Sequence, residues 1–342
     1  MANVSSESRW AEAIVKEYEM RRGEVPKPNT IYIGGGTPSI LSEESLAKVI
    51  EALPVSDLEE FTIEANPEDV TVEKARFWRS LGIDRVSMGV QSLCDAELKI
   101  IGRRHTAAEA EQAIKNLREA GFDNISIDLI YGLPGQDLVS WQRSLTRLLD
   151  FRPEHFSAYI LSYEPKTRLS VMLRRGEVCE ATEDEIGEMY DFLCVCARDR
   201  GYDHYEISNF CLPGREARHN SSYWRDEPYL GLGPSAHSFD GSCRRYNPSN
   251  LKEYLAKIES GLPAYEIEKE TPDNRFNDLL MVTLRTRQGL PLASVPTSRL
   301  PQLLRDASPW LASGSLILTS THLFIPEPHL LISDSIISSL MQ

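Results

Sequence analysis

Five short β-rich runs recur along the first half of the chain, and helical segments separate them. The runs occupy residues 30–33, 61–65, 85–90, 125–131 and 156–161. Strand–helix units repeated in this way give parallel strands joined by right-handed crossovers. The alternation therefore predicts an α/β fold, built either as a barrel or as a doubly wound sheet.

Local capping signals place two of the helices. Thr106 and Glu109 form a capping-box pattern before an apolar stripe, and Gly121 stands where a left-handed residue would end that helix. Thr182 and Glu185 repeat the pattern further along. After residue 161 the alternation stops, and the stretch from His204 to about residue 250 has the composition of loops.

The C-terminal part of the chain has a different pattern. Residues 276–286 predict a helix, which polar and proline-rich linkers follow. Two short strand-like runs, 315–319 and 322–326, then precede a closing helix at 333–341. This order predicts a small winged-helix-like unit at the C-terminus.

Charge and composition narrow the classes of partner. The 342 residues carry a formal net charge of -14, so the chain as a whole has no electrostatic attraction to nucleic acid or to an anionic membrane. The basic tripeptide 103–105 would suit a small anionic ligand.

The sequence has no apolar stretch of ~20 residues and no secretory pattern at its start, so we expect a cytoplasmic protein. In such a protein the cysteines are expected to be reduced thiols. They are Cys94, Cys179, Cys194, Cys196, Cys211 and Cys243.

Glycines or polar residues follow the β-rich runs at their C-terminal ends. The segment 34–38 reads GGGTP, and Glu64, Gln91 and Asp128 end the next three runs. Glycines let backbone N–H groups approach a ligand closely. In a parallel barrel these ends share one rim, which is where active sites lie. Each residue alone could be an ordinary turn residue, whereas together they predict a ligand site.

An ordered set of motifs resembles the HemN/HemW branch of the radical-SAM superfamily, the oxygen-independent coproporphyrinogen III oxidase-like proteins. The motifs are IGGGTPS (33–39), EANP (64–67), SMGVQS (87–92), GRRH (102–105), DLIYGLPGQ (128–136), YEISNF (205–210), HNSSYW (219–224) and YLGLGPSAH (229–237). The resemblance implies a partial (β/α) TIM-like barrel whose first strand is missing, leaving the edge at 30–33 unpaired. It divides the chain into a radical-SAM core, 1–235, and a C-terminal domain, 236–342.

The resemblance also implies a site for S-adenosylmethionine on the rim. A sulfonium ligand with a carboxylate and a ribose needs backbone donors, an arginine and carboxylate acceptors. The resemblance implies that Gly35, Gly36 and Thr37 line its amino-acid end. The residues implied to contact its ribose, carboxylate and adenine regions, or a second such molecule, are Glu64, Gln91, Arg103 and Asp128.

The motif HNSSYW resembles the HNxxYW signature of heme chaperones, where it is associated with heme binding. The resemblance makes His219 the candidate heme ligand, with Tyr223 and Trp224 beside the porphyrin. A histidine in a loop beside aromatic residues can equally be a hydrogen-bonded structural residue. His237 and Cys243 are weaker alternatives for an axial position.

One departure from the family pattern concerns the iron–sulfur cluster. Family members carry a CxxxCxxC segment whose three thiolates ligate a [4Fe–4S] cluster, and this sequence has no such segment. The pair Cys194 and Cys196 lies on a predicted helix with the two thiols on different faces, which indicates core packing. The sequence either starts downstream of the true initiation site, which we favour, or is a paralogue without a cluster. We expect this chain to hold no cluster and not to cleave S-adenosylmethionine reductively.

Three functions follow from the resemblance. The leading one is a heme chaperone that binds heme and passes it to acceptor proteins, with S-adenosylmethionine in its barrel. A radical-SAM enzyme acting on a porphyrinogen, like coproporphyrinogen III oxidase, is the second. A degenerate regulatory module that only binds S-adenosylmethionine or heme is the third.

Overall fold

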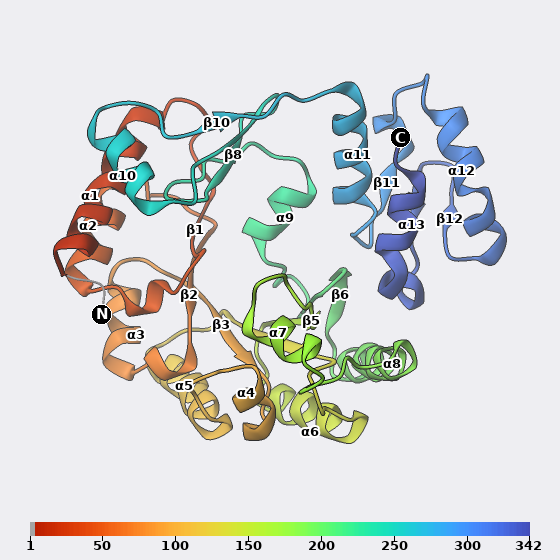
Figure 1. Cartoon of the computed structure of the whole chain (residues 1–342), viewed down its shortest axis with the longest axis horizontal. Helices are drawn as coiled ribbons and strands as arrows, with labels where there is room; N and C mark the ends of the chain where they lie inside the picture. Colours follow the sequence, from red (N-terminus) through yellow and green to blue (C-terminus); the bar gives the residue numbers. More distant parts are fainter. Residues whose placement is uncertain (1–3) are drawn as a thin grey trace.

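The computed structural model describes residues 4–342, and its centre is a curved mixed sheet (Figure 1). Within these residues the sheet has seven strands in the order β1-β2-β3-β4-β5-β7-β6. The first five strands pair in parallel, whereas β7 and β6 are antiparallel. The bounds are β1 Thr30–Ile33, β2 Glu60–Ala65, β3 Arg85–Gln91, β4 Ile125–Tyr131, β5 His155–Ile160, β6 Asp203–Glu206 and β7 Asn209–Cys211. The predicted α/β half-barrel is confirmed.

Helices follow the parallel strands and lie along the outside of the sheet (Figure 1). Both predicted capping boxes are formed, at Thr106 with Glu109 and at Thr182 with Glu185. The helices up to β6 are α1 Val4–Arg21, α2 Glu43–Ala52, α3 Val72–Ser80, α4 Asp95–Ile100, α5 Ala107–Glu119, α6 Leu138–Leu149, α7 Arg168–Arg174 and α8 Glu183–Asp199, with the 3-10 turns η1 Pro38–Ile40 and η2 Pro67–Asp69.

Strand register brings the predicted rim residues to one edge. Glu64 of β2 aligns with Ser87 of β3, and Gly89 of β3 aligns with Asp128 of β4. Buried apolar side chains such as Ile63 and Val86 alternate along these strands with buried polar ones such as Thr62. Because parallel strands end at the same side of a sheet, the polar residues that follow them share one rim.

The chain after β7 contains more regular structure than the loop composition of 204–250 predicted. These elements are α9 Arg218–Trp224, β8 His237–Phe239, β9 Arg244–Tyr246, α10 Leu251–Glu259 and β10 Glu266–Ile267. The helix α9 packs against β1 on one side and α11 on the other. The strand β1 is therefore an edge strand with a helix beside it.

The C-terminal unit packs onto the same apolar core as the barrel, through residues such as Leu280 and Leu303. The helices and strands of this unit are α11 Pro272–Thr283, β11 Leu290–Pro291, η3 Leu292–Ser294, α12 Leu300–Ser313, β12 Ile317–Leu318, β13 His322–Phe324, η4 Glu327–Ile332 and α13 Ser333–Leu340. The prediction of linkers after residue 286 was wrong for 300–313, which is helical. Pro301 lies in the first turn of α12, where no N–H bond is lost, and Pro309 lies inside the helix.

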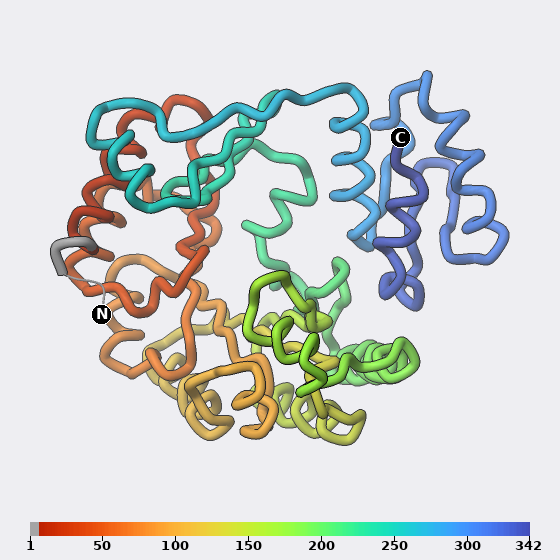
Figure 2. Tube along the Cα trace, viewed as in Figure 1, coloured from red at the N-terminus to blue at the C-terminus, as the bar shows by residue number. Residues whose placement is uncertain are grey.

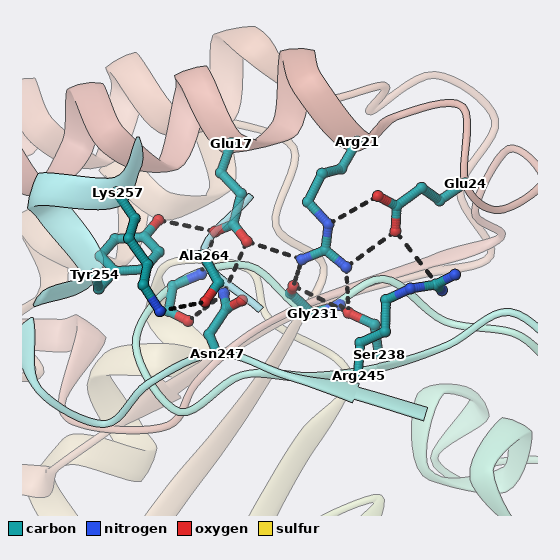
Figure 3. Close-up of polar contacts among 11 residues, drawn as sticks. Glu17, Arg21, Glu24, Gly231, Ser238, Arg245, Asn247, Tyr254, Lys257 and Ala264 are labelled. Atoms are coloured by element: carbon teal, nitrogen blue, oxygen red, sulfur yellow. Dashed lines mark hydrogen bonds and ion pairs between the residues drawn. The ribbon is translucent and has the colours of Figure 1, made fainter. Parts of the chain in front are cut away.

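A buried ion-pair network ties α1 to the segment after α9 (Figure 3). The Glu17 carboxylate is fully buried and accepts hydrogen bonds from Gly233 N, Asn247 Nδ2 and Tyr254 Oη, each at 2.7–2.8 Å. Arg21 pairs with it at 2.8 Å and also donates to Ser238 Oγ. Because Tyr254 belongs to α10, its bond to Glu17 joins α10 to α1, and the two helices lie side by side (Figure 2).

None of the helices within residues 4–342 combines the length and the apolar composition that crossing a bilayer requires.

Candidate functional site

The first part of the rim is the glycine loop after β1, which packs against Glu64. Gly35 N donates to Glu64 Oε2 at 3.2 Å, and Tyr32 Oη donates to Glu64 Oε1 at 2.8 Å. A Cβ on Gly34 would lie 2.4 Å from the Tyr32 ring and 2.6 Å from Glu64 Oε1. Position 34 therefore requires glycine because the side chains of Tyr32 and Glu64 approach it closely, and not because its φ is positive.

The second part of the rim is the end of β3 with Arg103. Gln91 has a φ of 69°, and the register with β4 shifts between Gly89 and Gln91. Arg103 Nη2 donates to Asn66 Oδ1 at 2.9 Å and to the carbonyl of Gly89. A left-handed non-glycine residue at a bulged strand end is a strained feature of the kind found at ligand sites.

Asp128 is the third part of the rim and is electrostatically coupled to the other two. Burial raises the pKa of Asp128 to about 6, and the charge of Glu64 acts in the same direction. A hydrogen bond with Ser157 and the charges of Arg85 and Arg103 oppose that rise. Two carboxylates close enough to influence each other favour a cationic ligand.

The structure brings together most, but not all, of the predicted rim residues. Gly35 is hydrogen-bonded to Glu64, Arg103 is hydrogen-bonded to Gly89 near the end of the strand that carries Gln91, and the charges of Glu64 and Arg103 act on Asp128. Gly36 is exposed, and a Cβ there would meet no atom within 4 Å. Thr37 precedes η1 as its N-cap and makes no capping hydrogen bond with its side chain.

The basic tripeptide 103–105 is not an open cationic patch. Arg104 Nε lies 3.1 Å from Glu68 Oε1, and His105 Nδ1 lies 3.3 Å from Glu68 Oε2. Burial lowers the pKa of His105. Arg103 is thus the residue of the three that faces the rim.

His219 lies on α9, so its predicted position in a loop was wrong. The helix has no side-chain cap from its own N-cap residue, Ala217. The Glu60 carboxylate instead accepts the N–H groups of Arg218 at 2.9 Å and His219 at 3.0 Å. A carboxylate at a helix N-terminus satisfies free donors and interacts favourably with the helix dipole.

Both ring nitrogens of His219 have partners. Nδ1 lies 2.8 Å from Thr30 Oγ1, and Nε2 lies 3.0 Å from Tyr223 Oη, one helical turn along α9. The ring stacks on Tyr32 with centroids 5.1 Å apart and an interplanar angle of 20°. Burial lowers the pKa of His219 to about 4, so the imidazole is neutral near pH 7.

An open cavity of about 1520 Å³ lies beside these residues, between β1, α9 and the C-terminal unit. Its wall is aromatic on the α9 side, and the other candidate histidine, His237, also lines it. Cys243, the third candidate, lies in the turn between β8 and β9. The aromatic lining residues are Trp10, Tyr18, Tyr32, Tyr205, Tyr223, Trp224 and Tyr229.

The sequence reading missed the residues that hold His219. Glu60 lies at the beginning of β2, far along the chain from α9, and no local pattern links the two. Thr30 and Tyr32 are two residues apart on β1. This spacing puts both side chains on one face of a strand, and it was the signal that the sequence offered.

The cysteines do not fit a cluster held by three thiolates of this chain. Cys94 precedes α4, Cys179 is exposed, and Cys211 is buried in β7. Among the described residues, the one group of three or more His, Cys, Asp or Glu donor atoms lying within 4.8 Å of one another contains a single cysteine.

Comparisons with known proteins agree on one family. A family model described as the radical SAM superfamily matches residues 2–148. The heme chaperone HemW of Bacillus subtilis is 38% identical over 271 residues, which are 78% of this chain and 72% of that protein. HemW of Mycobacterium tuberculosis H37Rv is 32% identical over 344 residues, covering 98% of this chain and 87% of that protein.

One solved structure shares the fold over the whole chain. Coproporphyrinogen III oxidase (HemN) from Escherichia coli aligns with a TM-score of 0.83 and 18% identity, covering 100% of this chain and 85% of that one. At this identity the likeness shows the fold alone.

Proposed function

This chain belongs to the HemW family of radical-SAM proteins, and we propose from that premise that it is a heme chaperone. It would bind heme in the cavity beside α9 and pass it to acceptor proteins. The observation that carries the proposal is the identity of 32–38% with heme chaperones over most of the chain. The cavity supports it, because its aromatic wall and neutral histidine suit a flat, apolar, iron-containing ligand.

His219 is the proposed iron ligand, through Nε2. A histidine that ligates a metal usually has its other nitrogen hydrogen-bonded, which fixes the ring. Thr30 Oγ1 supplies that partner for Nδ1. Heme binding then requires Tyr223 Oη to leave Nε2, and this exchange makes the site weaker than one with a free nitrogen. A weak, reversible ligand suits a protein that must release its cargo.

Cations on the cavity wall would pair with the two heme propionates. Arg225 and Arg287 both line the cavity. Arg287 lies 3.9 Å from Asp203 with its side chain 60% exposed, so its guanidinium is available for a new partner. Arg225 already pairs with Glu227 at 2.6 Å. Arg287 is therefore the better candidate for the propionate contact.

S-adenosylmethionine is the proposed ligand of the rim. Gly35, Gly36 and Thr37 would receive its amino-acid end, and Glu64, Gln91, Arg103 and Asp128 would contact the rest. The carboxylates of Glu64 and Asp128 would attract its positively charged sulfonium group. The positive φ of Gln91 is a backbone strain of the kind found at ligand sites. When bound, S-adenosylmethionine supplies a cationic nucleoside next to β1. The cysteines of this chain do not fit the cluster, so reductive cleavage of S-adenosylmethionine is not part of the proposed function.

A porphyrinogen-oxidising enzyme and a regulatory binding module are the alternatives. The likeness to HemN concerns the fold and does not by itself favour oxidation. A regulatory module would bind heme or S-adenosylmethionine without passing heme on.

Heme transfer separates these three functions. The chain is loaded with one equivalent of hemin, mixed with an apo-haemoprotein, and followed by the absorbance of the acceptor. If the chain is a chaperone, the acceptor takes up heme faster from the loaded chain than from free hemin. In a separate incubation with coproporphyrinogen, a chaperone leaves that compound unchanged. Binding without delivery would support the regulatory module, and consumption of coproporphyrinogen would support the enzyme.

A further inference from the structure

Three different metal-binding side chains meet where the barrel joins the C-terminal unit. Cys194 comes from α8, His204 from β6 and Glu327 from η4. One ligand atom of each lies within 4.8 Å of the other two. None of these three residues lines the α9 cavity or belongs to the predicted rim, and neither proposed ligand involves them.

The His204 ring is held in one orientation. It stacks on Phe210 with centroids 4.0 Å apart and an angle of 14°, and its side chain is 3% exposed. Nε2 lies 3.3 Å from the carbonyl oxygen of Ile207. A carbonyl only accepts hydrogen bonds, so this contact is a hydrogen bond in the tautomer that carries its proton on Nε2. Donation from one ring nitrogen to a backbone carbonyl is the usual arrangement of a metal-ligating histidine.

The other ring nitrogen faces a carboxylate. His204 Nδ1 lies 3.2 Å from Glu327 Oε1. In a neutral ring that donates through Nε2, Nδ1 is an acceptor, so two acceptors face each other. Two arrangements resolve this: a proton on Nδ1, which then donates to Glu327 Oε1, or a metal ion bound by both atoms.

The thiol distinguishes these two possibilities. A protonated imidazole paired with a carboxylate needs no sulfur, yet Cys194 places Sγ beside both atoms. Metal binding would displace the proton of that thiol. Sulfur, nitrogen and oxygen donors together are typical of Zn²⁺ sites, whereas Mg²⁺ and Ca²⁺ prefer oxygen alone.

We propose that Cys194, His204 and Glu327 bind one divalent transition-metal ion of the zinc type, with a fourth position open to water. Tetrahedral coordination places S and N donors about 3.5 Å apart, so the side chains close by small rotations. The Glu327 side chain is 37% exposed and provides the path of entry.

The ion would join two parts of the fold. The backbone of Glu327 is already held by Tyr190 Oη, which donates to its carbonyl at 2.8 Å. Cys194 and Tyr190 both lie on α8. A bound ion would therefore fasten η4 to the barrel beside that contact and stabilise the attachment of the C-terminal unit.

Metal titration of the untagged full chain tests the site. The chain is reduced, stripped with a chelator and titrated with Co²⁺, and the thiolate-to-cobalt charge-transfer band is followed in the near ultraviolet. We expect one Co²⁺ per chain, displaced by Zn²⁺, with a rise in the melting temperature. Absence of the band, or of any metal-dependent melting shift, would overturn the proposal and leave an imidazolium–carboxylate pair.

Matched variants locate the ion. Cys194→Ser removes the sulfur band, whereas Cys196→Ser, two residues further along α8, retains it. Glu327→Gln lies at a half-exposed position that tolerates the change. It should weaken Zn²⁺ binding roughly tenfold or more and reduce the metal-dependent melting shift. Equal metal affinity in the wild type and both cluster variants would also overturn the proposal, even if Cys194→Ser were poorly folded.

Discussion

The Tyr32 ring stacks on His219, with ring centroids 5.1 Å apart, while the Tyr32 hydroxyl donates to Glu64 at 2.8 Å. One side chain therefore contacts both the rim and the cavity. Any ligand that changes the hydrogen bonding of Glu64 acts on the residue that supports the His219 ring. The two proposed ligands thus share Tyr32 as a neighbour.

Two substitutions of Tyr32 separate its two contacts. Tyr32→Phe keeps the stacked ring and loses the hydrogen bond to Glu64, so heme affinity should stay unchanged while S-adenosylmethionine affinity changes. Tyr32→Leu loses both contacts and should lower heme affinity by about fivefold, as expected for a stacked pair. Hemin titration and calorimetry measure the two affinities. Equal heme affinity in Tyr32→Leu and the wild type would mean that the stacking has no role.

The low pKa of His219 predicts a pH-dependent contribution to stability. The folded pKa is about 4 and the ordinary value is 6.5, so the unfolded chain binds the proton more tightly. The contribution is complete above pH 6.5 and is lost as the pH falls toward 4, by about 1–3 kcal/mol in total. Urea unfolding from pH 7 to pH 4 measures it as the difference between the wild type and His219→Gln. A difference that does not change with pH would contradict the burial of a neutral imidazole.

The glycine loop offers a matched pair of substitutions. Gly34→Ala introduces a Cβ within 3 Å of Tyr32 and Glu64, which should cost about 1–3 kcal/mol of unfolding free energy. Gly36→Ala meets no atom within 4 Å and should leave stability unchanged. If Gly36 receives S-adenosylmethionine, the second variant still binds that ligand more weakly. Denaturation and calorimetry give the two readouts, and normal ligand affinity in Gly36→Ala would remove that residue from the site.

The buried network of α1 predicts a large cost for losing one partner. Arg21→Met leaves the Glu17 carboxylate buried without its cation and should destabilise the chain by about 3–5 kcal/mol. Arg9 pairs with Glu259 at the surface of the same helix, so Arg9→Met should leave the urea midpoint unchanged. Similar midpoints for the two variants would show that the network of Figure 3 contributes little.

Local patterns explain what could be predicted from the sequence. The β-rich runs and both capping boxes depend on residues a few positions apart, and the structure contains them where the sequence places them. The rim was predictable because strands that are parallel must end on one side. The helix α12 was missed since Pro301 and Pro309 are read as breakers, although the first lies where a helix tolerates proline.

Contacts between distant segments explain what could not be predicted. The helix that carries His219 is capped by Glu60, which is 158 residues from Arg218 along the chain. Cys194 was considered with Cys196, its neighbour in sequence, whereas its neighbours in space are His204 and Glu327. Neither relationship leaves a periodic or spacing signal in the sequence.

Hemin titration of His219→Ala tests the proposed heme site most directly. The absorbance of the Soret band is followed for the wild type, for His219→Ala and for His322→Ala, a histidine of β13 outside the cavity. We expect saturation at one heme per chain in the wild type and in His322→Ala, and an affinity at least about tenfold lower in His219→Ala, from the loss of the axial bond. Wild-type affinity and an unchanged Soret band in His219→Ala would contradict heme ligation by α9.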